Sequence, residues 1–145
     1  MKARDGMQAA ADAGLPVVFF PEGTTTNGSE LLKFHSGLLA QAMEERAPVT
    51  AAYISYRLGE RNDVGVTVAD DVCYWGDAQM LSHIFKLLGL RGLRAEVRFA
   101  ERPIKFSSDV MHRKMAAIEA RFAVAALGEQ ASTEGREVSE GVHHF

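Results

Sequence analysis

The chain has 145 residues, of which 47% are hydrophobic and 24% charged, which is enough for one ordinary globular core. Its formal net charge is −3, so it lacks the basic excess of a general nucleic-acid binder. Its one cysteine, Cys73, excludes an intramolecular disulfide and a cysteine-based metal site.

The first part of the sequence predicts two helices and two strands in alternation. Residues 2–13 have the spacing of an amphipathic helix, which Gly14 ends. Leu15–Phe20 is a short, wholly apolar run, typical of a strand buried on both faces of a sheet. After a polar loop, we expect a second helix from Ser36 and then a strand over Val49–Tyr56, which is rich in β-forming residues.

The second part predicts two more strands and two more helices. The alternation of valines over Val64–Val68 predicts a strand with one buried face. A helix with an apolar side is expected after Asp77, and a strand over Ala95–Phe99. A long helix is expected to start near residues 107–109 and to bury one apolar stripe in the core: Met111, Met115, Ile118 and Phe122.

The order of these elements indicates an α/β domain, with a mixed sheet flanked by helices. This domain occupies residues 1–127. Residues 128–145 are rich in Glu, Ser and Gly and predict a disordered tail. The first strand comes without the earlier strands that such a sheet would normally have, so we expect the domain to be incomplete.

A polar loop follows directly on the first strand. It runs over residues 21–29 and combines two glycines with four hydroxyl side chains and the carboxylate of Glu22. Glycines let backbone N–H groups approach a ligand, hydroxyls donate to phosphate oxygens, and α/β folds place ligands at the ends of buried strands. These residues alone leave two interpretations open: a polar ligand site, and a long surface turn with Asn27 and Gly28 at its corner.

The block Phe20-Pro21-Glu22-Gly23-Thr24-Thr25 closely resembles the Phe-Pro-Glu-Gly-Thr-Arg/Thr block of the 1-acylglycerol-3-phosphate (lysophosphatidic acid) acyltransferases. Its flanks agree as well. Gly14–Val18 resembles the family's Gly-x-Pro-Val-Val approach, and Leu32–Leu39 its Leu-Pro-Phe-Lys-x-Gly-Leu/Phe continuation. Pro48–Tyr56 is similar to the next block, a Pro-Val-x-Pro strand, and the resemblance extends from Gly14 to Pro103. The resemblance thus implies a glycerolipid acyltransferase-like fold.

Such enzymes transfer a fatty acyl group from acyl-CoA or acyl-carrier protein to the hydroxyl of a lysophospholipid, in phospholipid biosynthesis. The resemblance implies lysophosphatidate as acceptor, although related members acylate other lysolipids, including amino-acid-based ones, and it implies no resident cofactor. By match, the acceptor headgroup site consists of Pro21, Glu22, Gly23, Thr24 and Thr25. A carboxylate repels a phosphate, so Glu22 is expected to bind a cation, a hydroxyl or backbone donors that shape the loop.

The family's catalytic pair is a His-x4-Asp motif, in which the histidine is the general base and the aspartate orients it. No aspartate stands five positions after any of the five histidines, and the family's upstream arginine block is absent too. We therefore assign no catalytic residue and expect the chain to be the inactive C-terminal part of a longer enzyme. The alternative is a naturally inactive lipid- or phosphate-binding module.

For three further features of the sequence, two interpretations remain open. His35, where the family more often has Lys, is either a group that titrates beside the loop or a partly exposed residue at a helix start. Ile84–Arg94 has three cations and no acids, and either rests on an anionic membrane surface or packs into the core. Asp70, Asp71 and Asp77 either bind a metal or are turn and cap residues, and no metal ligand is assigned.

No apolar stretch approaches the roughly 18–20 residues of a membrane-spanning helix. The lipid substrates nevertheless imply contact with a membrane surface. The expected location is the cytoplasmic face of a membrane, with peripheral attachment or an anchor upstream of the printed sequence.

Overall fold

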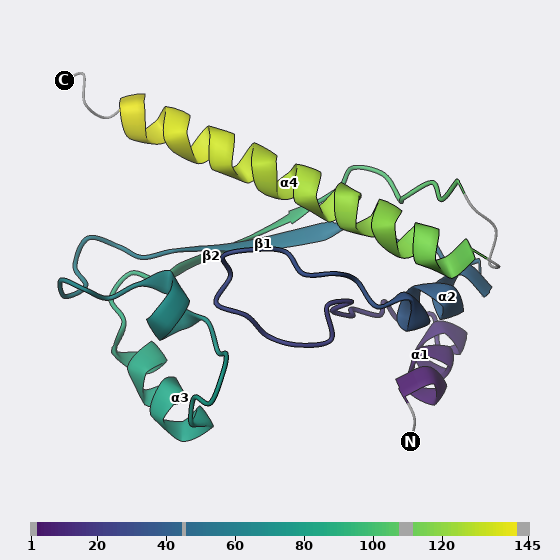
Figure 1. The fold of residues 1–145 in the computed structure, drawn as a ribbon, viewed down its shortest axis with the longest axis horizontal. Helices are drawn as coiled ribbons and strands as arrows, with labels where there is room; N and C mark the ends of the chain where they lie inside the picture. Colours follow the sequence, from purple (N-terminus) through teal and green to yellow (C-terminus); the bar gives the residue numbers. More distant parts are fainter. Residues whose placement is uncertain (1–2, 45, 108–111, 142–145) are drawn as a thin grey trace.

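The computed structural model describes residues 3–44, 46–107 and 112–141 (Figure 1). The four helices are α1 (Ala3–Asp12), α2 (Ser36–Glu44), α3 (Met80–Gly89) and α4 (Arg113–Gly141). The remaining elements are the strands β1 (Ala52–Arg57) and β2 (Arg94–Phe99) and a short π-helix, η1 (Val68–Val72). The sequence predicted each of these helices, apart from η1, and both strands at nearly these positions.

The two strands form an antiparallel sheet, whose register runs from Ala52 opposite Phe99 to Arg57 opposite Arg94. In Figure 1, α4 is drawn above this sheet and the segment between α1 and α2 below it. α4 approaches β1 closely, because a Cβ on Gly128 would lie 3.0 Å from a ring carbon of Tyr53. A larger mixed sheet flanked by helices stays a prediction for the whole domain.

The core lies where α4 meets α2 and the loop before it. α4 contributes small side chains, which allow its backbone to come close to its neighbours. The buried cluster consists of Phe34, Leu39, Ala117 and Ala120. The prediction that the larger stripe of α4 faces the core is wrong, because this stripe lies on the opposite side of the helix and is exposed at Met115, Ile118 and Phe122. Met111 lies outside the described residues.

The predicted strand Leu15–Phe20 is wrong as well. The segment joins no sheet in the described part of the chain, and Val18 and Phe20 are 81% and 68% exposed. A buried strand requires a neighbour whose backbone N–H and C=O groups complete the ladder. An apolar run alone does not supply that neighbour.

The predicted strand Val64–Val68 is replaced by a turn at residues 64–65 that leads into η1. Thr67 caps this helix, because its hydroxyl accepts the backbone N–H of Asp70 at 3.1 Å. In return, the carboxylate of Asp71 accepts the backbone N–H of Thr67 at 2.8 Å. Such local bonds compete with strand pairing and favour a helical turn here.

α4 continues to Gly141, whereas composition predicted a disordered tail from residue 128. Gly128 does not end the helix but gives room for Tyr53, and Ala131 beyond it is 6% exposed. The intervening Ala, Gln, Glu and Arg residues are good helix formers, which explains the difference. Residues 142–145 of the predicted tail lie outside the described residues. No helix in the described part is long and apolar enough to cross a membrane.

Candidate functional site

The loop of residues 20–35, called the Pro-Glu-Gly loop below, is closed by its own backbone. Gly23 N–H donates to the Phe20 carbonyl oxygen at 3.2 Å, which makes a tight turn around Pro21. Gly23 has a φ of +68°, a conformation that residues with a Cβ adopt only at a cost. His35 N–H donates to the Pro21 carbonyl oxygen at 2.7 Å and so ties the end of the loop to its beginning.

The carboxylate of Glu22 holds the middle of the loop. Its Oε2 accepts the backbone N–H of Leu32 at 3.0 Å, and this contact is partly buried. Of the three roles expected for Glu22, the structure shows the last, a bond to a backbone donor that shapes the loop. The repulsion between this carboxylate and an anionic ligand is thereby reduced, because the N–H group satisfies part of its charge.

Arg121 of α4 binds the same part of the loop from the other end of the chain. Its Nε donates to the Leu32 carbonyl oxygen at 2.9 Å, and its Nη2 donates to the Leu31 carbonyl oxygen at 2.6 Å. The planar guanidinium is suited to hold two acceptors at once. Sequence reasoning missed Arg121, since it lies 89 residues beyond Leu32 and no local pattern marks the contact.

The ring of His35 lies directly over Gly23. A Cβ on Gly23 would be 2.9 Å from Cδ2 of this ring and 3.4 Å from Nε2. Position 23 therefore requires glycine for two reasons, its backbone conformation and the room for the ring. The structure brings His35, whose role the sequence left open, into the matched block as a packing partner.

Four polar side chains of the loop, from Thr24 to Asn27, divide into two groups. Thr26 Oγ1 and Asn27 Oδ1 each accept the backbone N–H two residues further on, at 3.1 and 3.0 Å. They build the corner of the loop. Thr24 and Thr25 are exposed, and the structure gives them no hydrogen bond among the described residues. Their hydroxyl and backbone N–H groups can therefore donate to an anionic group on a ligand.

A large open cleft of about 1690 Å³ adjoins the loop. Leu15–Phe20 lines one part of it, and Pro21, Glu22 and Thr26 of the loop line another. The predicted site residues Gly23, Thr24 and Thr25 are not among its lining residues. The face of the sheet opposite α4 contributes apolar residues: Ala52, Ile54, Val97 and Phe99. A cleft with apolar walls beside a polar loop suits a ligand that has a polar head and an apolar chain.

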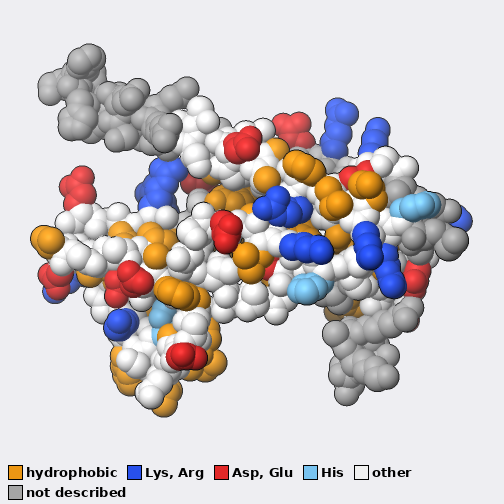
Figure 2. Space-filling view, in the orientation of Figure 1, with side chains coloured by type: hydrophobic (Ala, Val, Ile, Leu, Met, Phe, Trp, Pro, Cys, Tyr) orange, Lys and Arg blue, Asp and Glu red, His pale blue; other side chains and the backbone are white. Residues whose placement is uncertain are grey.

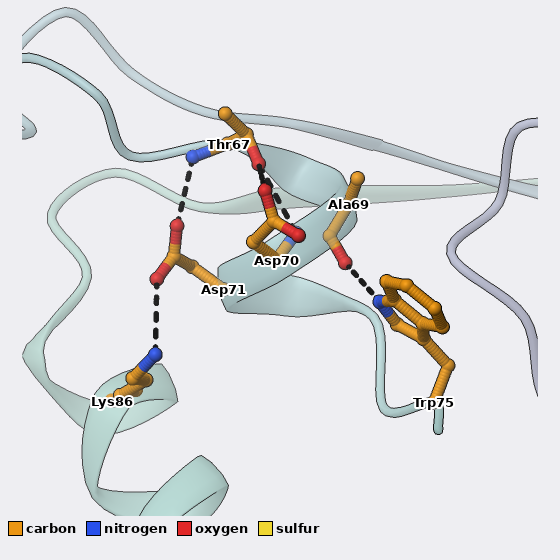
Figure 3. A network of polar contacts seen from close by, with 6 residues as sticks. All are labelled: Thr67, Ala69, Asp70, Asp71, Trp75 and Lys86. Carbon is orange, nitrogen blue, oxygen red and sulfur yellow. Dashed lines mark hydrogen bonds and ion pairs between the residues drawn. The ribbon is translucent and has the colours of Figure 1, made fainter. Parts of the chain in front are cut away.

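Cys73 packs against the corner of the loop, where a Cβ on Gly28 would lie 3.3 Å from its Sγ. Burial raises the pKa of the Cys73 thiol above its ordinary value. Asp70 and Asp71, considered above as metal ligands, instead bond to a hydroxyl, a backbone N–H and a lysine (Figure 3). In the described ranges, no three His, Cys, Asp or Glu side chains are grouped so that they could hold a metal ion.

Comparison with known proteins adds two findings. The model of the Acyltransferase family matches residues 1–55, which include the whole Pro-Glu-Gly loop. The lyso-ornithine lipid O-acyltransferase of Pseudomonas aeruginosa is 43% identical over 84 residues, which are 58% of this chain and 30% of that relative. The matched region is thus less than a third of the relative's length. No solved structure matches the chain.

Proposed function

We propose that this chain, which belongs to the glycerolipid acyltransferase family, binds the acceptor for an enzyme that transfers a fatty acyl group to the hydroxyl of a lysolipid. The Pro-Glu-Gly loop carries the proposal. Its backbone is held by hydrogen bonds with three residues: Glu22, His35 and Arg121. Thr24 and Thr25 remain exposed. A loop fixed in this way is preorganised for a headgroup, because little ordering remains to be done on binding.

The acceptor that we propose first is a lyso-ornithine lipid, the substrate named for the relative, with lysophosphatidate second. The amino-acid headgroup carries both an amine and a carboxylate, whereas the phosphate of lysophosphatidate is doubly anionic near neutral pH. The loop contains one cation, Lys33, and two carboxylates, Glu22 and Glu30, so it has no excess of positive charge. A headgroup of mixed charge is repelled less by such a loop than a phosphate is.

The acyl donor in this proposal is acyl-CoA or acyl-carrier protein, with no resident cofactor. A general base takes the proton of the acceptor hydroxyl, whose oxygen attacks the thioester carbonyl, and the thiol leaves. No histidine of this sequence is followed by an aspartate five positions later, so we propose that the chain binds the acceptor without transferring the acyl group itself. The proposed location is the cytoplasmic face of a membrane.

Calorimetric titration of the full chain with a short-chain lyso-ornithine lipid and, separately, with a short-chain lysophosphatidate, each below its micelle concentration, tests the acceptor site. We expect saturable binding that the double variant Thr24→Val/Thr25→Val weakens about tenfold, since two hydrogen bonds are lost. Ser82→Ala, which removes an exposed hydroxyl on α3, is the control and should bind as the wild type does. Failure of the wild type to bind either lysolipid would contradict the acceptor role.

A radiometric assay with acyl-CoA or acyl-carrier protein as donor and the same lysolipids tests the proposal that the chain does not transfer the acyl group itself. We expect no acylated product from the chain by itself, although it binds the acceptor. Turnover would contradict the proposal that the general base is absent from these residues.

A further inference from the structure

Helix α3 presents its apolar side away from the rest of the protein. None of its described residues is buried. Its large apolar side chains follow the spacing of one helix face and are 41% to 76% exposed: Met80, Leu81, Ile84, Phe85 and Leu88. Figure 2 shows hydrophobic side chains gathered over the part of the molecule where α3 lies. The interpretation of this helix as core-packed is therefore wrong.

The polar side of α3 is the side that contacts the protein. Lys86 reaches back to η1, where its Nζ lies 3.9 Å from Asp71 Oδ1 (Figure 3). The ring of His83 lies 5.3 Å from that of Tyr74, centroid to centroid. Both residues lie on the helix side opposite the apolar stripe, since successive residues are about 100° apart. A helix that only packed onto its own domain would have the reverse orientation.

The chain after α3 is fixed by Asn62. The Asn62 side chain donates to the carbonyl oxygens of Arg91 and Gly59, both at 2.8 Å, and accepts the Arg91 N–H at 2.7 Å. Gly59 N–H in turn donates to the Gly92 carbonyl oxygen at 3.0 Å. The contacts of the polar side of α3, together with those of the segment after the helix, therefore hold its apolar face outward.

We propose that this apolar face of α3 and the cations beside it dock onto an anionic lipid bilayer. Arg91 and Arg94, which follow the helix, are exposed, and no acidic residue lies between positions 80 and 94. Cations beside an exposed apolar helix face are complementary to a bilayer with negatively charged headgroups. Trp75, 42% exposed just before the helix, adds a side chain suited to the interface between water and lipid.

The exposed stripe of α4 has acidic and basic neighbours together. Met115, Ile118 and Phe122 are also exposed, and both the acidic Glu119 and the exposed Lys114 lie beside them. An acidic side chain opposes approach to an anionic bilayer. α4 therefore provides an internal control for α3. The membrane contact rests on the geometry of α3 and not on the proposed acyl transfer, so each can fail without the other.

Co-sedimentation of the full chain with vesicles tests the docking surface. The vesicles are phosphatidylcholine alone or phosphatidylcholine with 30% phosphatidylglycerol, a composition on the order of natural anionic leaflets. We expect binding to the anionic vesicles, reduced at least about tenfold by Phe85→Ser because one large inserted side chain is lost. Phe122→Ser is the matched control, since Phe85 is 73% and Phe122 66% exposed, and should leave binding unchanged.

The double variant Arg91→Gln/Arg94→Gln tests the charge. We expect about a fivefold loss of binding per cation, confined to the anionic vesicles. Three results would overturn the proposal: no vesicle binding by the folded wild type, equal loss in Phe85→Ser and Phe122→Ser, or an oligomer in sedimentation velocity that Phe85→Ser dissociates while vesicle binding is unchanged. The last result would assign the face to a second copy of the chain. Circular dichroism confirms that each variant is folded.

Discussion

The Pro-Glu-Gly loop and helix α3 are held to the protein in different ways. The loop is rich in polar residues, yet Glu22, His35 and Arg121 fix it through bonds to its own backbone and to α4. α3 is mostly apolar, yet no described residue of it is buried, and it is attached through Lys86 and His83. The loop is built into the domain by these polar contacts together with Phe34, which is buried in the core, whereas α3 has no buried apolar side chain.

Substitutions in the loop and in α3 should therefore affect different properties of the protein. A change in the contacts of the loop should lower the stability of the protein, because groups that are partly buried lose their partners. A change on the outer face of α3 should leave stability nearly unchanged and alter binding alone, because an exposed side chain has no partner in the protein to lose.

The largest effect is expected from Arg121→Ala, which removes both donors to the carbonyl oxygens of Leu31 and Leu32. We expect the free energy of unfolding to fall by about 2–3 kcal/mol, since hydrogen bonds from a charged group are the stronger kind. Urea denaturation measures this. Arg113→Ala, at the exposed start of α4, is the matched control and should change stability by less than about 0.5 kcal/mol. Equal losses in the two variants would remove the special role of Arg121.

Gly23→Ala should have the next largest effect, a loss of about 1–2 kcal/mol, because it combines a positive φ with a clash against the His35 ring. Gly14→Ala has the same φ of +68° but open space around the Cβ, so it should lose less. Gly37→Ala, inside α2 and also without a close contact, should gain about 0.5–1 kcal/mol. Urea denaturation of the three variants checks this order, and an equal loss at positions 14 and 23 would exclude a contribution from His35.

The smallest effect concerns Cys73, whose thiol pKa is raised by burial. Folding favours the neutral thiol, so its stabilising contribution is complete below the ordinary thiol pKa and is lost as pH rises through the raised value. At mildly alkaline pH the thiolate fraction is smaller than in a free thiol. We expect iodoacetamide to alkylate Cys73 more slowly than it alkylates glutathione, with the rates equal after denaturation. Faster alkylation in the folded chain would contradict the stated burial.

Much of the secondary structure followed from local patterns, whereas its packing did not. The apolar spacing of α1 to α4, and the β-forming runs of β1 and β2, were enough to predict those elements. The predicted cap of α3 was wrong, because Gln79 rather than Asp77 precedes the helix, and it makes no side-chain cap bond. The orientation of α4 could not be predicted, because it has apolar residues on two sides and only the small ones, such as Ala117 and Ala120, fit against its neighbours. Leu15–Phe20 was misassigned because a strand depends on a partner elsewhere in space.

The sequence named the matched residues of the candidate site as one group but did not distinguish the contacts that each of them makes. Glu22, Thr24 and Thr25 were named as one group, and the structure gives the first a bond inside the loop and leaves the other two exposed. Arg121 had no local signal at all, since its contact is with residues far away in the sequence.

Glu22 shapes the Pro-Glu-Gly loop by accepting the backbone N–H of Leu32, and we propose that this shape is what binds the acceptor. Titration of a short-chain lyso-ornithine lipid into Glu22→Gln and Glu22→Ala tests it most directly. Glutamine keeps an oxygen that can accept the Leu32 N–H, so Glu22→Gln should bind within about threefold of the wild type, while Glu22→Ala, which leaves that N–H without its partner, should lose about tenfold or more. If Glu22→Gln loses as much affinity as Glu22→Ala, the charge of the carboxylate is what matters and the claim is contradicted.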